Sequence, residues 1–232
     1  MTLFAILALG FFLGMRHATD SDHVIAVTTI VSRARSARAA LWVGALWGLG
    51  HSATILAVGG ALVLFGWVIP PRLGLSMEMS VAVMLIVLGV MNLSGVLTRI
   101  DQIAHPGQHA GLDESPVAHV HLRGALRPLV IGVVHGLAGS AAVALLVLAT
   151  IKSASMAVVY LAIFGAGTLA GMLLLTMAMA LPISLISQRF SNVEQLMARV
   201  TGLVSIAFGL FLAYRIGIAD GLLFGTPHWA PR

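Results

Sequence analysis

The sequence contains no cysteine and few charged residues, and both absences limit what the protein can be. Of its 232 residues only 9% are charged, whereas soluble domains carry about 25%. Without cysteine the chain has no disulfide framework, no thiolate metal site and no thiol nucleophile. The first residues also lack the basic stretch and the small-residue cleavage site of a secretory signal peptide, so we expect none.

The rest of the composition is largely apolar and predicts an all-α, polytopic membrane protein. Hydrophobic residues make up 59% of the chain, and the mean hydropathy is +1.02. The basic residues behind the net charge of +5 lie in short clusters between apolar runs, which indicates orientation signals and no nucleic-acid partner. Apolar runs of about 20 residues predict six spans, at residues 2–31, 41–68, 79–98, 127–150, 156–181 and 199–220.

Arginines in the connecting loops predict the orientation of the chain in the membrane. If the first, third and fifth loops face the cytoplasm, that side carries most of the basic residues. They are Arg33, Arg35, Arg38, Arg99, Arg123, Arg127, Arg189 and Arg199. The positive-inside rule then places both ends of the chain outside.

The two halves of the chain look alike. The matches are Gly14-x-x-His17 with Gly132-x-x-His135, Gly48-Leu49-Gly50-His51 with Gly165-Ala166-Gly167-Thr168, and Gly89 with Gly209. Each half contains three predicted spans, and an odd number inserts the second copy upside down, which gives an inverted repeat. The alternative is that glycine-rich apolar sequence aligns with itself by chance.

The repeat divides the chain into three expected parts. Residues 1–98 form a first three-helix repeat, whose first helix is too long for one straight crossing and is expected to be broken at its polar centre. Residues 99–126 form a histidine-containing polar loop on the cytoplasmic side. Residues 127–232 form the second three-helix repeat.

Five ionisable side chains lie in the middle of the first predicted span: Arg16, His17, Asp20, Asp22 and His23. A charged side chain at this depth costs roughly 2.5–3.5 kcal/mol on insertion scales, so the stretch indicates a functional site. The alternative is a buried ion-pair network that only fixes helix packing.

The spacing of these residues does not suit an unbroken helix. At 3.6 residues per turn, His17, Asp20 and His23 share one side, whereas Asp22 points away. We therefore expect the backbone to unwind around Thr19-Asp20-Ser21, unless Asp22 has a separate role. Arg16 and Asp20 are four residues apart and are expected to pair, which leaves Asp22 as the uncompensated anion.

Imidazole and carboxylate ligands together suit divalent transition metals. His51, between small residues in the second span, is a candidate third imidazole, and the alternative is a histidine bonded to a backbone carbonyl. His135 is the repeat copy of His17 and a candidate for the metal or its pathway. Its half has Ala138 and Ser140 where the first half has aspartates, so we expect one asymmetric site.

Weaker candidates complete the set. Secondary metal or pathway residues are Asp20, Ser52, Asn92, His135 and Ser140, although an interhelical hydrogen bond is the favoured role of Asn92. The polar loop carries His105, His109, His119 and His121, which either collect metal weakly or are incidental. The eleven methionines show no repeating pair motif, which disfavours copper(I).

The polar stretch resembles the signature of the nickel/cobalt transporter family, a histidine followed after four residues by Asp-His. His17, Asp22 and His23 fit that spacing, and Leu49-Gly50-His51-Ser52 is similar to the family's second motif. Members typically have eight spans with the hallmark in the second, whereas here it lies in the first of six. The segment His135-Gly136-Leu137-Ala138-Gly139-Ser140 is similar to the shorter, urease-accessory-type nickel permeases related to this family.

The resemblance implies a multi-pass protein that moves Ni²⁺ or Co²⁺ across the cytoplasmic membrane. His17, Asp22, His23 and His51 would be essential for metal recognition, with the ion as substrate and no prosthetic group. Implied partners are the metal ion and membrane lipids, and homo-oligomers, metallochaperones and urease or hydrogenase maturation proteins are to be considered.

A secondary transporter is the preferred function, with uptake favoured over export. The sequence contains no phosphate-binding loop, so this chain is not expected to hydrolyse nucleotide. We expect no enzymatic activity. The alternatives are an exporter of the same fold, an intramembrane metal-dependent hydrolase, which would lack a spare general base, and a metal sensor or assembly factor that binds without moving ions.

Overall fold

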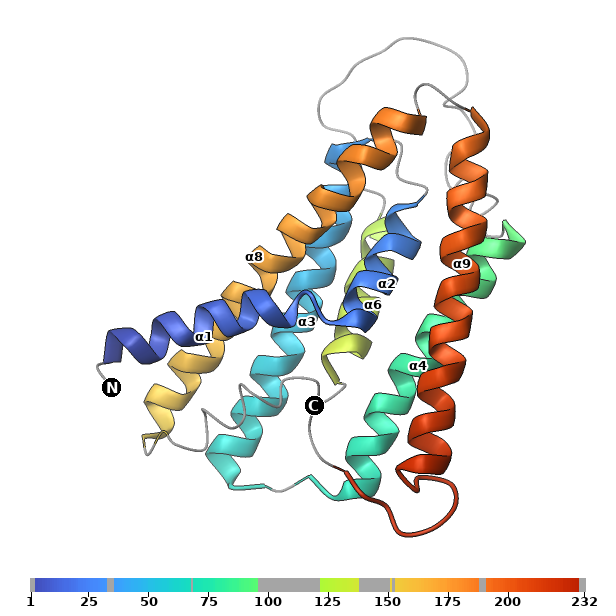
Figure 1. Ribbon diagram of the computed structural model, residues 1–232. Coiled ribbons are helices and arrows are strands. Elements are labelled where there is room, and N and C mark those ends of the chain that lie inside the picture. The colour runs from blue at the N-terminus through green and yellow to red at the C-terminus, as the bar shows by residue number, and fades with distance from the viewer. Residues whose placement is uncertain are drawn as a thin grey trace.

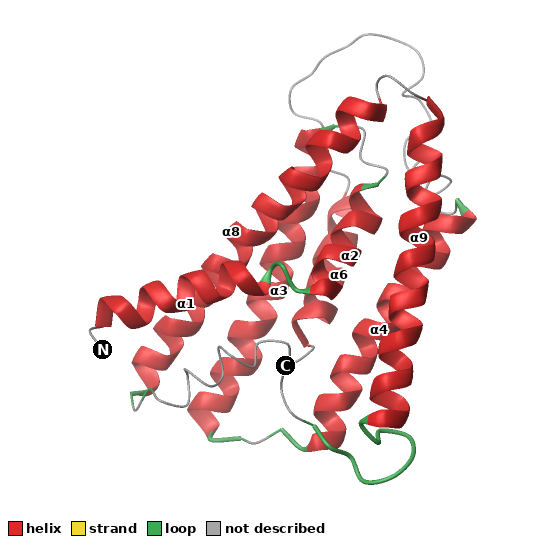
Figure 2. Ribbon diagram, viewed as in Figure 1, coloured by secondary structure: helices red, strands yellow, loops and turns green. Residues whose placement is uncertain are grey.

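The computed structural model describes residues 3–32, 36–67, 69–95, 122–137, 151, 153–187 and 191–229. Within these ranges the protein is helical and contains no strand (Figure 2), which confirms the predicted all-α class. The helices are α1 (Leu3–His17), α2 (Ser21–Val31), α3 (Ala37–Phe65), α4 (Pro71–Ser94), α6 (Leu122–Leu137), α8 (Ala154–Ser187), α9 (Ser191–Tyr214) and the π-helix η1 (Arg215–Ala219) (Figure 1).

Four helical stretches among the described residues are long and apolar enough to cross a membrane, so the chain is an integral membrane protein. They are Ala37–Phe65, Pro71–Ser94, Ala154–Ile183 and Gln195–Ala219, close to four of the predicted spans. The predicted span at 2–31 instead forms the two shorter helices α1 and α2. Of the predicted span at 127–150, the structure describes only the part in α6, and residues 138–150 lie outside the described ranges.

The interruption expected at the polar centre of the first span is present. Helix α1 ends at His17 and α2 begins at Ser21, and Asp20 before it has an extended backbone with φ −62° and ψ 151°. Figure 1 shows that the two helices meet at an angle. The last turn of α1 therefore faces the first turn of α2, where partial negative and positive helix-end charges lie close together.

Two helix pairs frame the molecule. Helix α3 packs against α8, and α4 packs against α9. Helix α2 contacts α4, α8 and α9, and α6 contacts α3 and α4, so these two shorter helices bridge the pairs (Figure 1). The polar break therefore lies in the middle of the bundle.

The buried core fills the space between the bridging helices and the two pairs. Val27 of α2, Trp47 of α3, Leu85 of α4 and Met172 of α8 are each at most 1% exposed and belong to one apolar cluster. Large apolar side chains such as Phe12 also cover the outer faces, where a membrane protein contacts lipid.

Helix α1 packs closely against α8, and the contact depends on glycine. A side chain at Gly14 would collide with the carbonyl oxygen of Phe164, and one at Gly167 would collide with the carbonyl oxygen of Phe11. Small residues of this kind let two helix backbones approach in a membrane.

The contact between α6 and α3 repeats this arrangement. A side chain at Gly132 would collide with the carbonyl oxygen of Trp47, and one at Gly50 would collide with the carbonyl oxygen of Leu129. In the sequence match, Gly132 is the counterpart of Gly14 and Gly50 that of Gly167. Both crossings therefore use the same small residues on both of their helices.

These crossings predict a large effect of a single methyl group. Gly14→Ala and Gly132→Ala are each expected to lower the free energy of unfolding by about 1–3 kcal/mol, because the added carbon overpacks against a backbone that cannot move easily. The thermal denaturation midpoint of the detergent-purified protein measures the change.

Gly60→Ala is the matched control for these substitutions. Gly60 also lies inside a helix, α3, but a side chain there would meet nothing within 4 Å. This variant is expected to be as stable as the wild type or up to about 1 kcal/mol more stable, through helix propensity. Equal midpoints for all three variants would contradict the packing account.

Candidate metal centre

Four buried histidines from four helices meet where the first span is broken. His17 ends α1, His23 lies in the first turn of α2, His51 in α3 and His135 in the last turn of α6. His17 is 6% exposed and the other three are fully buried. Ring centroids of neighbouring imidazoles are 4.2–5.8 Å apart. Burying polar rings is unfavourable unless they gain partners, so this concentration indicates a ligand site.

The break in the backbone brings Asp22 into this cluster. Because α2 starts only at Ser21, Asp22 no longer has to point away as it would on one continuous helix. His135 Nε2–H donates to Asp22 Oδ2 at 2.8 Å, and His23 Nδ1–H donates to Asp22 Oδ1 at 3.2 Å. One carboxylate therefore joins α2 to α6 through two imidazoles.

A second carboxylate orients His17. The ring of His17 donates from Nδ1 to Asp20 Oδ2 at 2.9 Å, and its Nε2 lies 3.1 Å from Nε2 of His51. Metal-ligating histidines commonly hold their other nitrogen on a carboxylate in this way. Two nitrogens bound to one ion at about 2.0–2.1 Å are themselves about 2.9–3.4 Å apart. The spacing of the two Nε2 atoms therefore fits a shared metal ion.

Three ring nitrogens of the cluster have no hydrogen-bond partner among the described residues: His23 Nε2, His51 Nδ1 and His135 Nδ1. Buried polar atoms are normally paired, so each such atom calls for an explanation. A bound cation would explain His23 Nε2, because His23 Nδ1–H donates to Asp22 and the neutral ring then offers the lone pair of Nε2 to a metal.

The cluster contains two sets of three residues that could each hold an ion. One set is His17, His23 and His51, and the other is Asp22, His23 and His135. In each set, one nitrogen or oxygen from every residue lies within 4.8 Å of the others. Imidazole with carboxylate suits a divalent transition metal better than Mg²⁺ or Ca²⁺.

Comparison with known proteins shows the family to which the chain belongs. Residues 5–211 match the model of the cytochrome c biogenesis protein transmembrane region. Over 220 residues the chain is 35% identical to the urease accessory protein UreH of Bacillus sp. (strain TB-90), and the match covers 95% of each chain. The chain belongs to this membrane-protein family. No solved structure matches it.

This relative confirms the predicted likeness to urease-accessory-type proteins. The chain contains no cysteine. At the helix break, four buried histidines lie together with Asp20 and Asp22.

The expected ion pair of Arg16 with Asp20 is not formed among the described residues. Among the described residues the ion-pair partner of Asp20 is His17, and Arg16 is exposed. The expected pair required helical spacing from residue 16 to residue 20, but α1 ends at His17. The carboxylate of Asp20, whose side chain is 42% exposed, therefore faces the imidazole.

Two weaker candidates bind helices together at other places. Ser52 donates to the carbonyl oxygen of Gly165 at 2.9 Å and ties α3 to α8. Asn92 Nδ2 lies 3.0 Å from the carbonyl oxygen of Ala198 and 3.3 Å from that of Thr29, and so connects α4 with α9 and α2. Ser140 and the four loop histidines lie outside the described residues.

Two aromatic side chains that border the centre were not among the predicted residues. The ring of Phe164 lies 5.6 Å from that of His17, and the ring of Trp47 lies 5.5 Å from that of His135. Trp47 and Phe164 directly precede the matched glycine segments of the two halves. That position in the repeat was the signal that could have identified them as two equivalent walls of the site.

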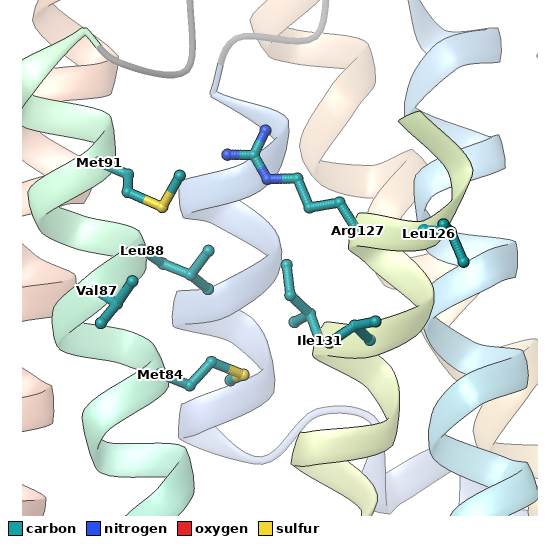
Figure 3. A pocket seen from close by; sticks show the side chains of 8 residues that line it. Met84, Val87, Leu88, Met91, Leu126, Arg127 and Ile131 are labelled. Carbon is teal, nitrogen blue, oxygen red and sulfur yellow. The ribbon is translucent and has the colours of Figure 1, made fainter. Parts of the chain in front are cut away.

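An open apolar groove of about 450 Å³ lies between α4 and α6 (Figure 3). The residues around it are Met84, Val87, Leu88, Met91, Leu126, Arg127, Val130 and Ile131. Arg127 extends over one end of it, and the other labelled side chains are apolar. None of these residues belongs to the histidine cluster, so the groove is separate from the centre.

Asp20→Asn is expected to weaken binding of a divalent metal about 10–100-fold, because it removes the carboxylate that orients His17. Equilibrium binding of Ni²⁺ to the purified protein measures the effect. Asp220→Asn, after η1 and away from the centre, is the matched control and should bind like the wild type. Unchanged affinity in the Asp20 variant would remove Asp20 from the site.

Proposed function

We propose that the protein is a secondary transporter that moves Ni²⁺ or Co²⁺ across the cytoplasmic membrane. The observation that carries this proposal is the buried cluster of four histidines and Asp22 at a helix break inside an integral membrane protein. Ionisable residues inside membrane domains typically mark ion pathways. The principal ligands are His17, Asp22, His23 and His51.

Nickel is the preferred cargo. UreH is named a urease accessory protein, and the short permeases that this sequence resembles are nickel permeases of that type. Metallochaperones and urease maturation proteins are the corresponding partners. The ion is the substrate of the protein, and membrane lipids surround its apolar outer faces.

The contacts of the two aspartates favour transport over hydrolysis. Asp20 is engaged by His17, and Asp22 by His23 and His135. A hydrolase would need a further general base beside a metal-bound water, and the contacts of the cluster leave neither carboxylate free for that role.

The proposed mechanism requires the ion to lose much of its water. Asp22 supplies the negative charge that offsets this desolvation, and the neutral imidazoles replace water as ligands. Metal and protons compete for the same ring nitrogens, so metal affinity should fall as the pH is lowered. This competition also offers a route to proton coupling.

We further propose that residues 1–98 and 127–232 are inverted three-helix repeats, joined by a cytoplasmic loop at 99–126. The reciprocal crossings of α1 with α8 and of α6 with α3 support this architecture. A second reciprocal contact supports it too. Gly89 packs on the backbone at Gly202, and its counterpart Gly209 packs on the backbone at Ala82. Rocking of one repeat against the other would expose the site to each side in turn.

Accumulation of ⁶³Ni in cells that express the protein, compared with empty-vector cells, tests function and direction together. We expect uptake, and therefore more nickel than in empty-vector cells. Less nickel would show that the protein is an exporter. Transport would be contradicted if the cells accumulated as much ⁶³Ni and as much ⁵⁷Co as empty-vector cells while the protein is present in the membrane fraction.

A further inference from the structure

His23 belongs to both of the candidate ligand sets, and the two sets differ in origin. Its companions in the first set, His17 and His51, come from α1 and α3. Its companions in the second are Asp22 of α2 and His135 of α6. The first set therefore lies within the first half of the chain, whereas the second joins the two halves.

We propose that the ion occupies two alternative positions that share His23, and that transport moves it from one to the other. The first position is formed by His17, His23 and His51, and the second by Asp22, His23 and His135. This inference rests on the proposed transport function and assigns His135 a ligand role in one step of it.

The chemistry of imidazole prevents ions from occupying both positions at the same time. A neutral imidazole has one lone pair, so His23 binds one ion at a time. Two divalent cations this close together would also repel each other strongly. His23 stays bound while the other ligands exchange, so the ion keeps protein ligands throughout the transfer.

The contact between His135 and Asp22 keeps the second position closed. His135 Nε2–H donates to Asp22 Oδ2 at 2.8 Å, and this hydrogen bond has to break before an ion can bind between them. His135 Nδ1 is buried and has no partner among the described residues. For the ion to bind there, the ring proton has to move to Nδ1, which frees the lone pair of Nε2 for the ion.

An ion in the second position connects α2 with α6. Its binding energy then depends on how the two halves are placed relative to each other, whereas binding in the first position does not. Transfer between the positions thus couples ion binding to the motion of the halves. A variant that loses His135 but keeps the charge of Asp22 beside the shared His23 should bind metal and fail to move it.

Purified full-length protein with Co²⁺ as the probe tests this, because the visible absorption of bound Co²⁺ reports its ligands. Wild type is expected to bind one Co²⁺ per chain. His135→Ala should also bind one, with affinity within about tenfold of wild type, but should lose about 10–100-fold in Co²⁺ flux into proteoliposomes. His135→Gln, which can still donate to Asp22, should show the same separation.

His51→Ala supplies the reciprocal comparison. It should bind Co²⁺ more weakly through the second position, with a spectrum that differs from that of His135→Ala. Wild-type flux in both His135 variants would overturn the inference. So would a loss of Co²⁺ binding in these variants as large as the loss in His51→Ala, or the binding of two Co²⁺ ions per wild-type chain. Absence of flux in the wild type would instead contradict the transport proposal, while the spectra still decide between one position and two.

Discussion

His51→Ala is expected to lower the initial rate of nickel accumulation at least about 100-fold. The Nε2 atom of His51 lies 3.1 Å from that of His17, so the substitution removes one of the two nitrogens best placed to share an ion. Loss of a residue that only supports a metal ligand already costs about 10–100-fold. Loss of a ligand should cost more, and ⁶³Ni uptake at low external nickel measures it.

His228→Ala is the matched control for this substitution. His228 is exposed and follows η1 at the far end of the chain, so the same chemical change there should leave the rate unaltered. Both variants must reach the membrane at wild-type level. A His51→Ala rate close to wild type would exclude His51 from the ion site.

The second large effect is expected for Asp22→Asn. Asp22 accepts hydrogen bonds from two imidazoles on different helices, and its side chain is only 17% exposed. An amide keeps the size but removes the charge that offsets desolvation of a divalent cation. Ni²⁺ binding and flux should both fall at least about 100-fold, more than for Asp20→Asn.

Asp22→Glu separates charge from shape. It keeps the carboxylate at a longer reach, so it should bind Ni²⁺ more tightly than Asp22→Asn, though less tightly than the wild type. Titration calorimetry of the purified variants gives the three affinities. The assignment fails if the amide variant binds as well as the wild type, or if the Asp20 substitution proves more damaging than this one.

Much of the centre could be predicted because its residues are costly in a membrane. The density of ionisable groups identified the polar stretch. The angular spacing of His17, Asp22 and His23 on a helix predicted a break near Asp20, unless Asp22 had a separate role. That break is observed between His17 and Ser21. The repeat of Gly14-x-x-His17 as Gly132-x-x-His135 identified His135, which indeed lies in the cluster.

Other features depend on tertiary packing and could not be read from local spacing. The Arg16–Asp20 pair was predicted from the spacing of residues on a continuous helix, but α1 ends at His17, before Asp20. The break in the first apolar run was predicted, but the packing of α1 along α8 was not. The aromatic walls, Trp47 and Phe164, are apolar residues among many, and only their place in the repeat distinguishes them.

Flux of nickel through the purified protein tests the central claim most directly. Proteoliposomes with wild-type protein should accumulate ⁶³Ni above protein-free liposomes, and those with His17→Ala should not. His17 provides both the contact with Asp20 and the approach to His51, so its loss disrupts the first position. Equal flux with wild type and His17→Ala, or none with well-folded wild type, would contradict transport through this histidine cluster.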